Sequence, residues 1–119
     1  METTLVIGAS EKTDRYSNKA VRLLQYKNKP VVALGKRAGK INETEILAGF
    51  PLLKNIHTVS LYLNPANQRE YYDYILSLNP KRVIFNPGTE NPELYEKLAG
   101  KKIEFEEACT LVLLNTGMF

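Results

Sequence analysis

A turn rich in hydrogen-bond donors follows the first apolar run of the chain. The stretch LVIGASEKTDRYSNKAVRLLQ passes through Gly8, Ala9 and Ser10 and a polar loop into a segment with helical spacing. A glycine at such a turn brings backbone amides close to a phosphate, and the following helix adds partial positive charge. The Ser10 hydroxyl can donate to a phosphate oxygen. The turn therefore predicts phosphate binding, with a tight strand exit as the alternative, since the second and third glycines of a dinucleotide fingerprint are absent.

A cluster of cations follows the second apolar run, which stops at Gly35. The cations are Lys36, Arg37 and Lys40. A site for NAD places Asp or Glu at this position, where the carboxylate accepts hydrogen bonds from the ribose. Cations there instead predict an additional phosphate on the ribose, either 2′ as in NADP or 3′ as in coenzyme A (CoA). The alternative is a solvated basic loop, because Lys and Arg are common at surfaces.

The elements that must position these residues are short apolar runs. Buried parallel strands consist of short β-branched runs that end at turn residues, whereas an edge strand alternates apolar and polar residues. The sequence predicts strands at residues 4–7, 30–34, 58–63 and 82–85, and an edge-like last strand at 102–106. Residues 36–53 are predicted to be loop, with at most a short strand near 45–47.

Helical spacing occupies the segments between the strands. Ser17 or Asn18 is the expected N-cap of the first helix, Pro65 suits a first helical turn, and Gly100 is an expected C-cap. The predicted helices are residues 18–27, 67–78 and 92–98, and the tail 111–114 fits strand or helix. This alternation predicts one Rossmann-like α/β domain over residues 1–119, with a parallel sheet of about five strands and helices on both faces.

In such a sheet, ligands bind beyond the carboxyl ends of the strands, near the first strand. The residues at those ends should therefore lie together. They are Gly8, Ala9 and Ser10; Gly35, Lys36 and Arg37; Asn64 and Pro65; and Asn86, Pro87 and Gly88. Tyr16, in the loop on the phosphate side, is a further expected ligand contact, whereas Tyr71, Tyr72 and Tyr74 are expected to pack on a helix.

Several short motifs together resemble the small CoA-binding domain family, which is also similar to the nucleotide-binding domain of the succinyl-CoA synthetase alpha subunit. The motifs are LVIGAS, then Tyr16 and Asn18, basic residues after the second strand, YLNP at 62–65, NPGTENPE at 86–93 and ACT at 108–110. The resemblance covers nearly the whole chain. It implies a Rossmann-like fold that binds CoA or an acyl-CoA, without an assigned reaction.

The resemblance also implies roles for individual residues. Gly8, Ala9 and Ser10 would line the pyrophosphate or the pantetheine entry, and Lys36 and Arg37 would meet the 3′-phosphorylated ribose. Tyr62, Asn64 and Pro65 would lie against the adenine side or the pantetheine arm, and Asn86, Pro87 and Gly88 would form the other wall. The sequence departs from the family at Leu34-Gly35, where Asn-Pro is frequent, and at Asn86, where Gln is frequent.

Composition disfavours several other functions. Basic and acidic residues number 16 and 13 and are interspersed, which disfavours nucleic-acid binding. One cysteine, Cys109, excludes an internal disulfide, and one histidine, His57, disfavours a metal site or a serine-type triad. The chain has no run of about 18 apolar residues and no leader, so we expect an unprocessed cytoplasmic protein with no membrane segment.

The expected function is therefore binding of a small nucleotide ligand, with no catalytic constellation. Two alternatives remain. A small NADP-linked reductase would use the same basic residues for a 2′-phosphate, and an interaction domain would keep only a vestigial nucleotide cleft. The apolar tail LVLLNTGMF, residues 111–119, is either a homodimer contact or a segment that docks on its own sheet.

Overall fold

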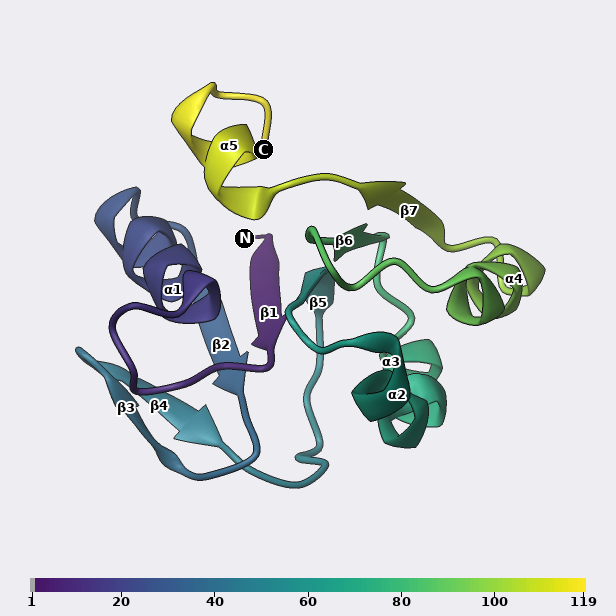
Figure 1. Cartoon of the computed structure of the whole chain (residues 1–119), viewed down its shortest axis with the longest axis horizontal. Helices are drawn as coiled ribbons and strands as arrows, with labels where there is room; N and C mark the ends of the chain where they lie inside the picture. Colours follow the sequence, from purple (N-terminus) through teal and green to yellow (C-terminus); the bar gives the residue numbers. More distant parts are fainter. Residues whose placement is uncertain (1) are drawn as a thin grey trace.

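The structure is a computed structural model that describes residues 2–119. Within these residues, seven strands form one sheet in the order β3-β4-β2-β1-β5-β6-β7 (Figure 1). β3 runs antiparallel to β4, and the other neighbouring strands are parallel. The strands are β1 (Thr3–Ile7), β2 (Val31–Leu34), β3 (Gly39–Ile41), β4 (Thr44–Leu47), β5 (Ile56–Leu61), β6 (Arg82–Phe85) and β7 (Glu104–Glu107).

Helices cover both faces of the sheet, as predicted. α1 and α5 lie side by side on one face, and α2, η1, α3 and α4 lie on the other (Figure 1). Their bounds are α1 (Tyr16–Tyr26), α2 (Pro65–Gln68), the 3₁₀ turn η1 (Arg69–Tyr71), α3 (Tyr72–Leu78), α4 (Pro92–Gly100) and α5 (Thr110–Asn115). The Rossmann-like α/β class is confirmed.

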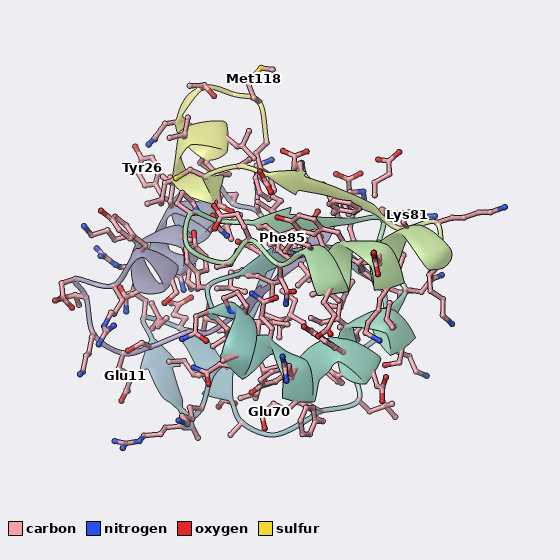
Figure 2. The ribbon with its side chains drawn as sticks, turned by 45° about the vertical axis from the view of Figure 1, so that its right-hand side comes forward. Glu11, Tyr26, Glu70, Lys81, Phe85 and Met118 are labelled. Carbon is pink, nitrogen blue, oxygen red and sulfur yellow. The ribbon has the colours of Figure 1, made fainter. Side chains whose placement is uncertain are left out.

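Alternation along the central strand divides the core between the two faces. Leu5 and Ile7 of β1 pack with Ile75 of α3, whereas Val6 packs with Leu24 of α1. Phe85 is fully buried, and Figure 2 shows it between the sheet and the helices, while Glu11, Tyr26 and Met118 lie at the periphery. Successive side chains of a strand point to opposite faces, so a buried parallel strand must be apolar on both.

The segment between β2 and β5 corrects the predicted loop. Residues 44–47 form β4, close to the short strand expected there, but residues 39–41 form the unpredicted β3. The two strands are joined at Asn42, whose φ of 53° is left-handed. Only Ile41 of β3 is buried, at 3% exposure, so a three-residue edge strand offered almost no hydrophobic pattern. The hairpin raises the strand number above the predicted five.

The helix boundaries correct two predicted caps. α1 begins at Tyr16 with Arg15 as its N-cap, so neither Ser17 nor Asn18 caps it. α4 continues through Gly100, and the left-handed residue that follows it is Lys102, with φ 59°. The predicted helix 67–78 is divided into α2, η1 and α3, and the tail forms α5, which docks on the sheet through Leu114.

The remaining bounds differ by a few residues. β5 begins at Ile56 and ends at Leu61, two residues before the predicted start and end. Asn64 caps α2 by accepting a hydrogen bond from the Asn67 amide at 3.0 Å, and Pro65 occupies the first turn, as predicted. β7 is an edge strand, also as predicted.

The turn after β1 is pressed against the ends of both neighbouring strands. The Leu34 carbonyl accepts hydrogen bonds from the amides of Gly8 and Ala9, at 2.8 and 3.0 Å. Gly8 has a left-handed φ of 98°, and a Cβ on it would lie 3.1 Å from the Tyr62 carbonyl carbon. A Cβ on Gly35 would lie 2.4 Å from the Ala9 carbonyl oxygen. Glycine is thus required at both positions by close backbone approach.

Gly35→Ala should reduce the free energy of unfolding by about 1–3 kcal/mol, because the Ala9 backbone and the Ile46 side chain must shift to admit the methyl group. Urea denaturation measures this change. Gly100→Ala is the matched control: a Cβ there meets nothing within 4 Å, so we expect no loss of stability. A Gly35→Ala protein with the wild-type midpoint would contradict the close approach.

Candidate functional site

An open cleft of two adjoining cavities follows the carboxyl ends of β1, β2, β5 and β6. The basic cavity, about 640 Å³, is lined by Ala9, Ser10, Glu11, Lys12, Arg15, Lys36, Arg37, Ala38 and Asn67. The tyrosine cavity, about 380 Å³, is lined by Gly8, Ser10, Arg15, Tyr16, Ser17, Tyr62, Asn64, Pro87, Gly88 and Thr89. Ser10 and Arg15 line both cavities, so they form the junction of the cleft.

The cleft brings together most of the predicted site residues. Its lining includes Gly8, Ala9, Ser10, Tyr16, Lys36, Arg37, Tyr62, Asn64, Pro87 and Gly88. Asn18, Pro65 and Asn86 are not among the lining residues. The convergence follows from the parallel sheet, which brings the carboxyl ends of adjacent strands to one edge.

The basic cavity holds cations that lack carboxylate partners. Lys12, Arg15, Lys36 and Arg37 surround it, and Glu11 is its one carboxylate. The ion pairs within residues 2–119 are His57–Glu2 and Arg69–Glu93, so none of the four cations is paired within 4.0 Å there. Adjacent unpaired cations repel one another, and an anionic ligand would relieve this repulsion.

A buried amide holds the loop that carries Ser10 and Arg15. The Asn18 Nδ2 donates to the Ser10 carbonyl at 2.8 Å, and its Oδ1 accepts from the Arg22 Nε at 2.7 Å. Arg22 also donates to the Thr13 carbonyl. Both polar atoms of Asn18 are therefore engaged within the protein, which makes it a positioning residue for the loop.

The amides available to an anion lie beyond Ala9, in the loop and at the start of α1. Those of Gly8 and Ala9 already donate to the Leu34 carbonyl. The amides of Tyr16, Ser17 and Asn18 precede the first intrahelical bond, from Lys19 to Arg15, and have no acceptor within residues 2–119. Unsatisfied amides of a first helical turn attract anions. The amides of Ser10 and Glu11, which line the basic cavity, also have no acceptor within residues 2–119. A phosphate in the cleft would thus meet free amides of both the loop after Ala9 and the start of the helix.

Two hydroxyl groups at this position can also donate. Ser10 Oγ accepts from the Lys12 amide at 3.1 Å, which leaves its proton available. Ser17 is 4% exposed and lines the tyrosine cavity, and its hydroxyl has no hydrogen-bond partner in the described part of the chain. Sequence reasoning treated Ser17 only as a cap and missed Arg15, because both assignments depend on the residue at which α1 begins.

Tyr62 lies in the wall between the cavity and the core. Its hydroxyl is buried and makes no hydrogen bond within residues 2–119, although the hydroxyls of Ser60 and Thr110 pair nearby at 2.8 Å. Burial raises the pKa of Tyr62 to about 12, with the neighbouring hydroxyls acting in the opposite direction. The phenol is therefore neutral near pH 7 and acts as an apolar wall.

Asn86 supports the opposite wall from within the core. Its Nδ2 donates to Ser60 Oγ at 2.9 Å and to the Leu61 carbonyl at 2.8 Å. Its Oδ1 accepts from the Thr110 amide at 2.8 Å. With 1% exposure, Asn86 joins β5, β6 and α5, and so fixes the strand ends from which Pro87 and Gly88 depart.

Other candidate sites in the chain are less organised. Two hollows lie elsewhere, one beside His57 and Lys81 and one along β7 from Lys102, and acidic side chains accompany the basic ones in both. Within residues 2–119 there is no group of three or more potential metal ligands of the His, Cys, Asp and Glu types. None of the helices described there has the length and apolar character to span a membrane. Cys109 is a free thiol at the N-cap of α5.

The chain is similar to a known sequence family and to several solved structures. The sequence model of the family described as "CoA binding domain" matches residues 2–115. No curated protein matches the chain significantly. A crystal structure described as that of an uncharacterized protein is 44% identical, with a TM-score of 0.96, and the match covers 100% of this chain and 98% of that one.

Two more distant structures share the fold. A protein from Thermus thermophilus is 20% identical with a TM-score of 0.87, over 99% of this chain and 90% of that chain. A conserved hypothetical protein from Pyrococcus furiosus is 18% identical with a TM-score of 0.80, over 94% and 99% respectively.

Tyr62→Phe should leave stability unchanged or raise it by about 1 kcal/mol, because a buried unpaired hydroxyl carries a desolvation cost. The control is Tyr72→Phe, since the Tyr72 hydroxyl accepts from Asn91 at 2.7 Å and donates to Glu93 at 3.0 Å. That change should cost about 1 kcal/mol. Urea denaturation compares the two variants, and a large loss for Tyr62→Phe would show that its hydroxyl has a partner.

Proposed function

Because the chain belongs to the CoA-binding domain family, we propose that it binds coenzyme A in the cleft at the carboxyl ends of the strands. The family supports the CoA-binding role. The single observation that favours this cleft is its division into a cationic cavity and a largely uncharged one, joined at Ser10 and Arg15. CoA has the same division, with a phosphorylated nucleotide at one end and a neutral pantetheine arm at the other.

The proposed ligand follows the cleft from the basic cavity to the tyrosine cavity. Lys36 and Arg37 bind the 3′-phosphate, since both are exposed and neither has a carboxylate partner among residues 2–119. The pyrophosphate lies at the junction, against Ser10, Arg15 and the first-turn amides of α1, where charge-assisted hydrogen bonds are available. The pantetheine arm lies against Tyr62, Asn64 and the Pro87-Gly88 turn. Tyr16, 67% exposed, flanks the entrance.

The groups around the arm favour binding over reaction. In the described structure, the lining of the tyrosine cavity contains no carboxylate, histidine, cysteine or lysine, and Tyr62 keeps its proton at neutral pH. General acid–base catalysis needs a group that titrates near the working pH. We therefore assign the protein a role in carrying or sensing CoA or an acyl-CoA, without a reaction of its own.

A small NADP-linked reductase is the second candidate. The observation that favours it is the same pair, Lys36 and Arg37, which would also bind a 2′-phosphate. An interaction domain with a vestigial cleft would bind neither nucleotide. Relative affinities for CoA and NADP distinguish the reductase and the interaction domain from the CoA proposal.

The experiment is calorimetric titration of CoA into the wild type and a variant with Ser10→Ala, Lys36→Ala and Arg37→Ala. Each lost hydrogen bond to a charged phosphate costs about 1.5–3 kcal/mol, so the combined loss of affinity should exceed about a hundredfold. The control combines Ser77→Ala, Lys27→Ala and Lys54→Ala, which removes one hydroxyl and two charges outside the cleft.

The control should retain wild-type affinity. Unchanged CoA affinity of the cleft variant would refute the assignment of the site to this cleft. Absence of CoA binding by the wild type would refute the proposed function. Preferential binding of NADP would instead favour the reductase.

A further inference from the structure

Glu11 is the one carboxylate that lines the basic cavity, in the company of four cations. It is not neutralised by any of them: within residues 2–119, no side-chain nitrogen of Lys or Arg lies within 4.0 Å of its carboxylate. Its Oε2 instead accepts a hydrogen bond from the Lys40 backbone amide at 3.0 Å. The orientation of the Glu11 carboxylate is therefore set by this backbone hydrogen bond and not by an ion pair with one of the four cations.

The β3–β4 hairpin supplies that support. Figure 2 shows Glu11 beside this hairpin, on the loop between β1 and α1. Gly39 leaves room for the side chain, because a Cβ there would lie 2.5 Å from Glu11 Cδ and 2.8 Å from Cγ and Oε2. The hairpin is itself fixed to α1, since Gln25 Nε2 donates to the Ile41 carbonyl at 2.8 Å and to Thr44 Oγ1 at 2.7 Å.

The supported carboxylate keeps one free oxygen. Oε2 is engaged by Lys40, whereas Oε1 has no hydrogen-bond partner among residues 2–119. An ionised carboxylate only accepts hydrogen bonds, so its partner must be a donor. In a cavity that also binds a phosphorylated ribose, the neutral donor next to that phosphate is the ribose hydroxyl that carries no phosphate.

We propose that Glu11 accepts a hydrogen bond from the free 2′-hydroxyl of the ribose, so that the cleft selects 3′-phosphorylated over 2′-phosphorylated nucleotides. This inference rests on the proposed function, because it places the nucleotide in the basic cavity. A 3′-phosphate on Lys36 and Arg37 leaves the vicinal 2′-hydroxyl for Glu11. A 2′-phosphate would place its negative charge next to the Glu11 carboxylate. The repulsion between these two anions would weaken binding of the 2′-phosphorylated isomer.

The test uses two isomers of equal charge, adenosine 3′,5′-bisphosphate and adenosine 2′,5′-bisphosphate, as competitors of bound CoA. The wild type should bind the 3′,5′ isomer about tenfold more tightly, the size of effect expected for one hydrogen bond to a charged group. In Glu11→Ala this preference should fall to about twofold or less. In Glu11→Gln, which keeps an acceptor for the Lys40 amide, the preference should also fall because the repulsion of a 2′-phosphate is removed.

Glu43→Gln, in the hairpin turn outside the cleft lining, is the control and should keep the full preference. Thermal unfolding of each variant verifies that it is folded. If CoA binds but the isomer preference is absent from the wild type, or is unchanged in both Glu11 variants, the inference is wrong and the proposed function stands. Failure of the 3′,5′ isomer to displace bound CoA also overturns the inference. Failure of CoA itself to bind overturns the proposed function.

Discussion

The cleft depends on one close backbone contact, between the turn after β1 and the end of β2. The Leu34 carbonyl accepts from two successive amides, those of Gly8 and Ala9, and Gly35 approaches the Ala9 carbonyl too closely to carry a side chain. This contact directs the following loop sideways across the strand ends. As a consequence, the Gly8 and Ala9 amides are engaged, and free amides reach the cleft from Ser10 and Glu11 and from the start of α1. Tyr62 takes part in the same contact, because the Tyr62 backbone occupies the space beside Gly8.

Electrostatics then separates the two ends of the cleft. Within residues 2–119, four cations at one end have no carboxylate partner and repel one another, and mutual repulsion of this kind is a common cost of a binding site. The other end is built from an uncharged tyrosine, an asparagine cap and a Pro-Gly turn. Buried amides support both ends: Asn18 fixes the loop and Asn86 fixes the strand ends. The arrangement fits a ligand that is anionic at one end and neutral at the other.

The sequence predicted the parts of the fold that follow from apolar patterning and turn residues. Strand ends at Gly8, Gly35 and Pro87 located the cleft, because parallel strands must share an edge. It did not predict the hairpin from 39 to 47, whose edge strand has a single buried side chain, nor the contact of Glu11 with Lys40, which joins distant segments. The resemblance places Asn18 and Asn86 among the motifs of the site. Their side chains are buried and hydrogen-bonded within the protein, and only the tertiary structure determines this.

The most direct measurement is the thermal shift of the wild-type protein with CoA and with 3′-dephospho-CoA at equal concentration. A ligand at about 100 times its dissociation constant adds about 2.7 kcal/mol of stability, which corresponds to a shift of several degrees. The account predicts that CoA produces such a shift and that 3′-dephospho-CoA, which gives Lys36 and Arg37 no ribose phosphate, produces a clearly smaller one. Equal shifts from both ligands would contradict the role of these cations, and no shift from either would contradict the cleft as a CoA site.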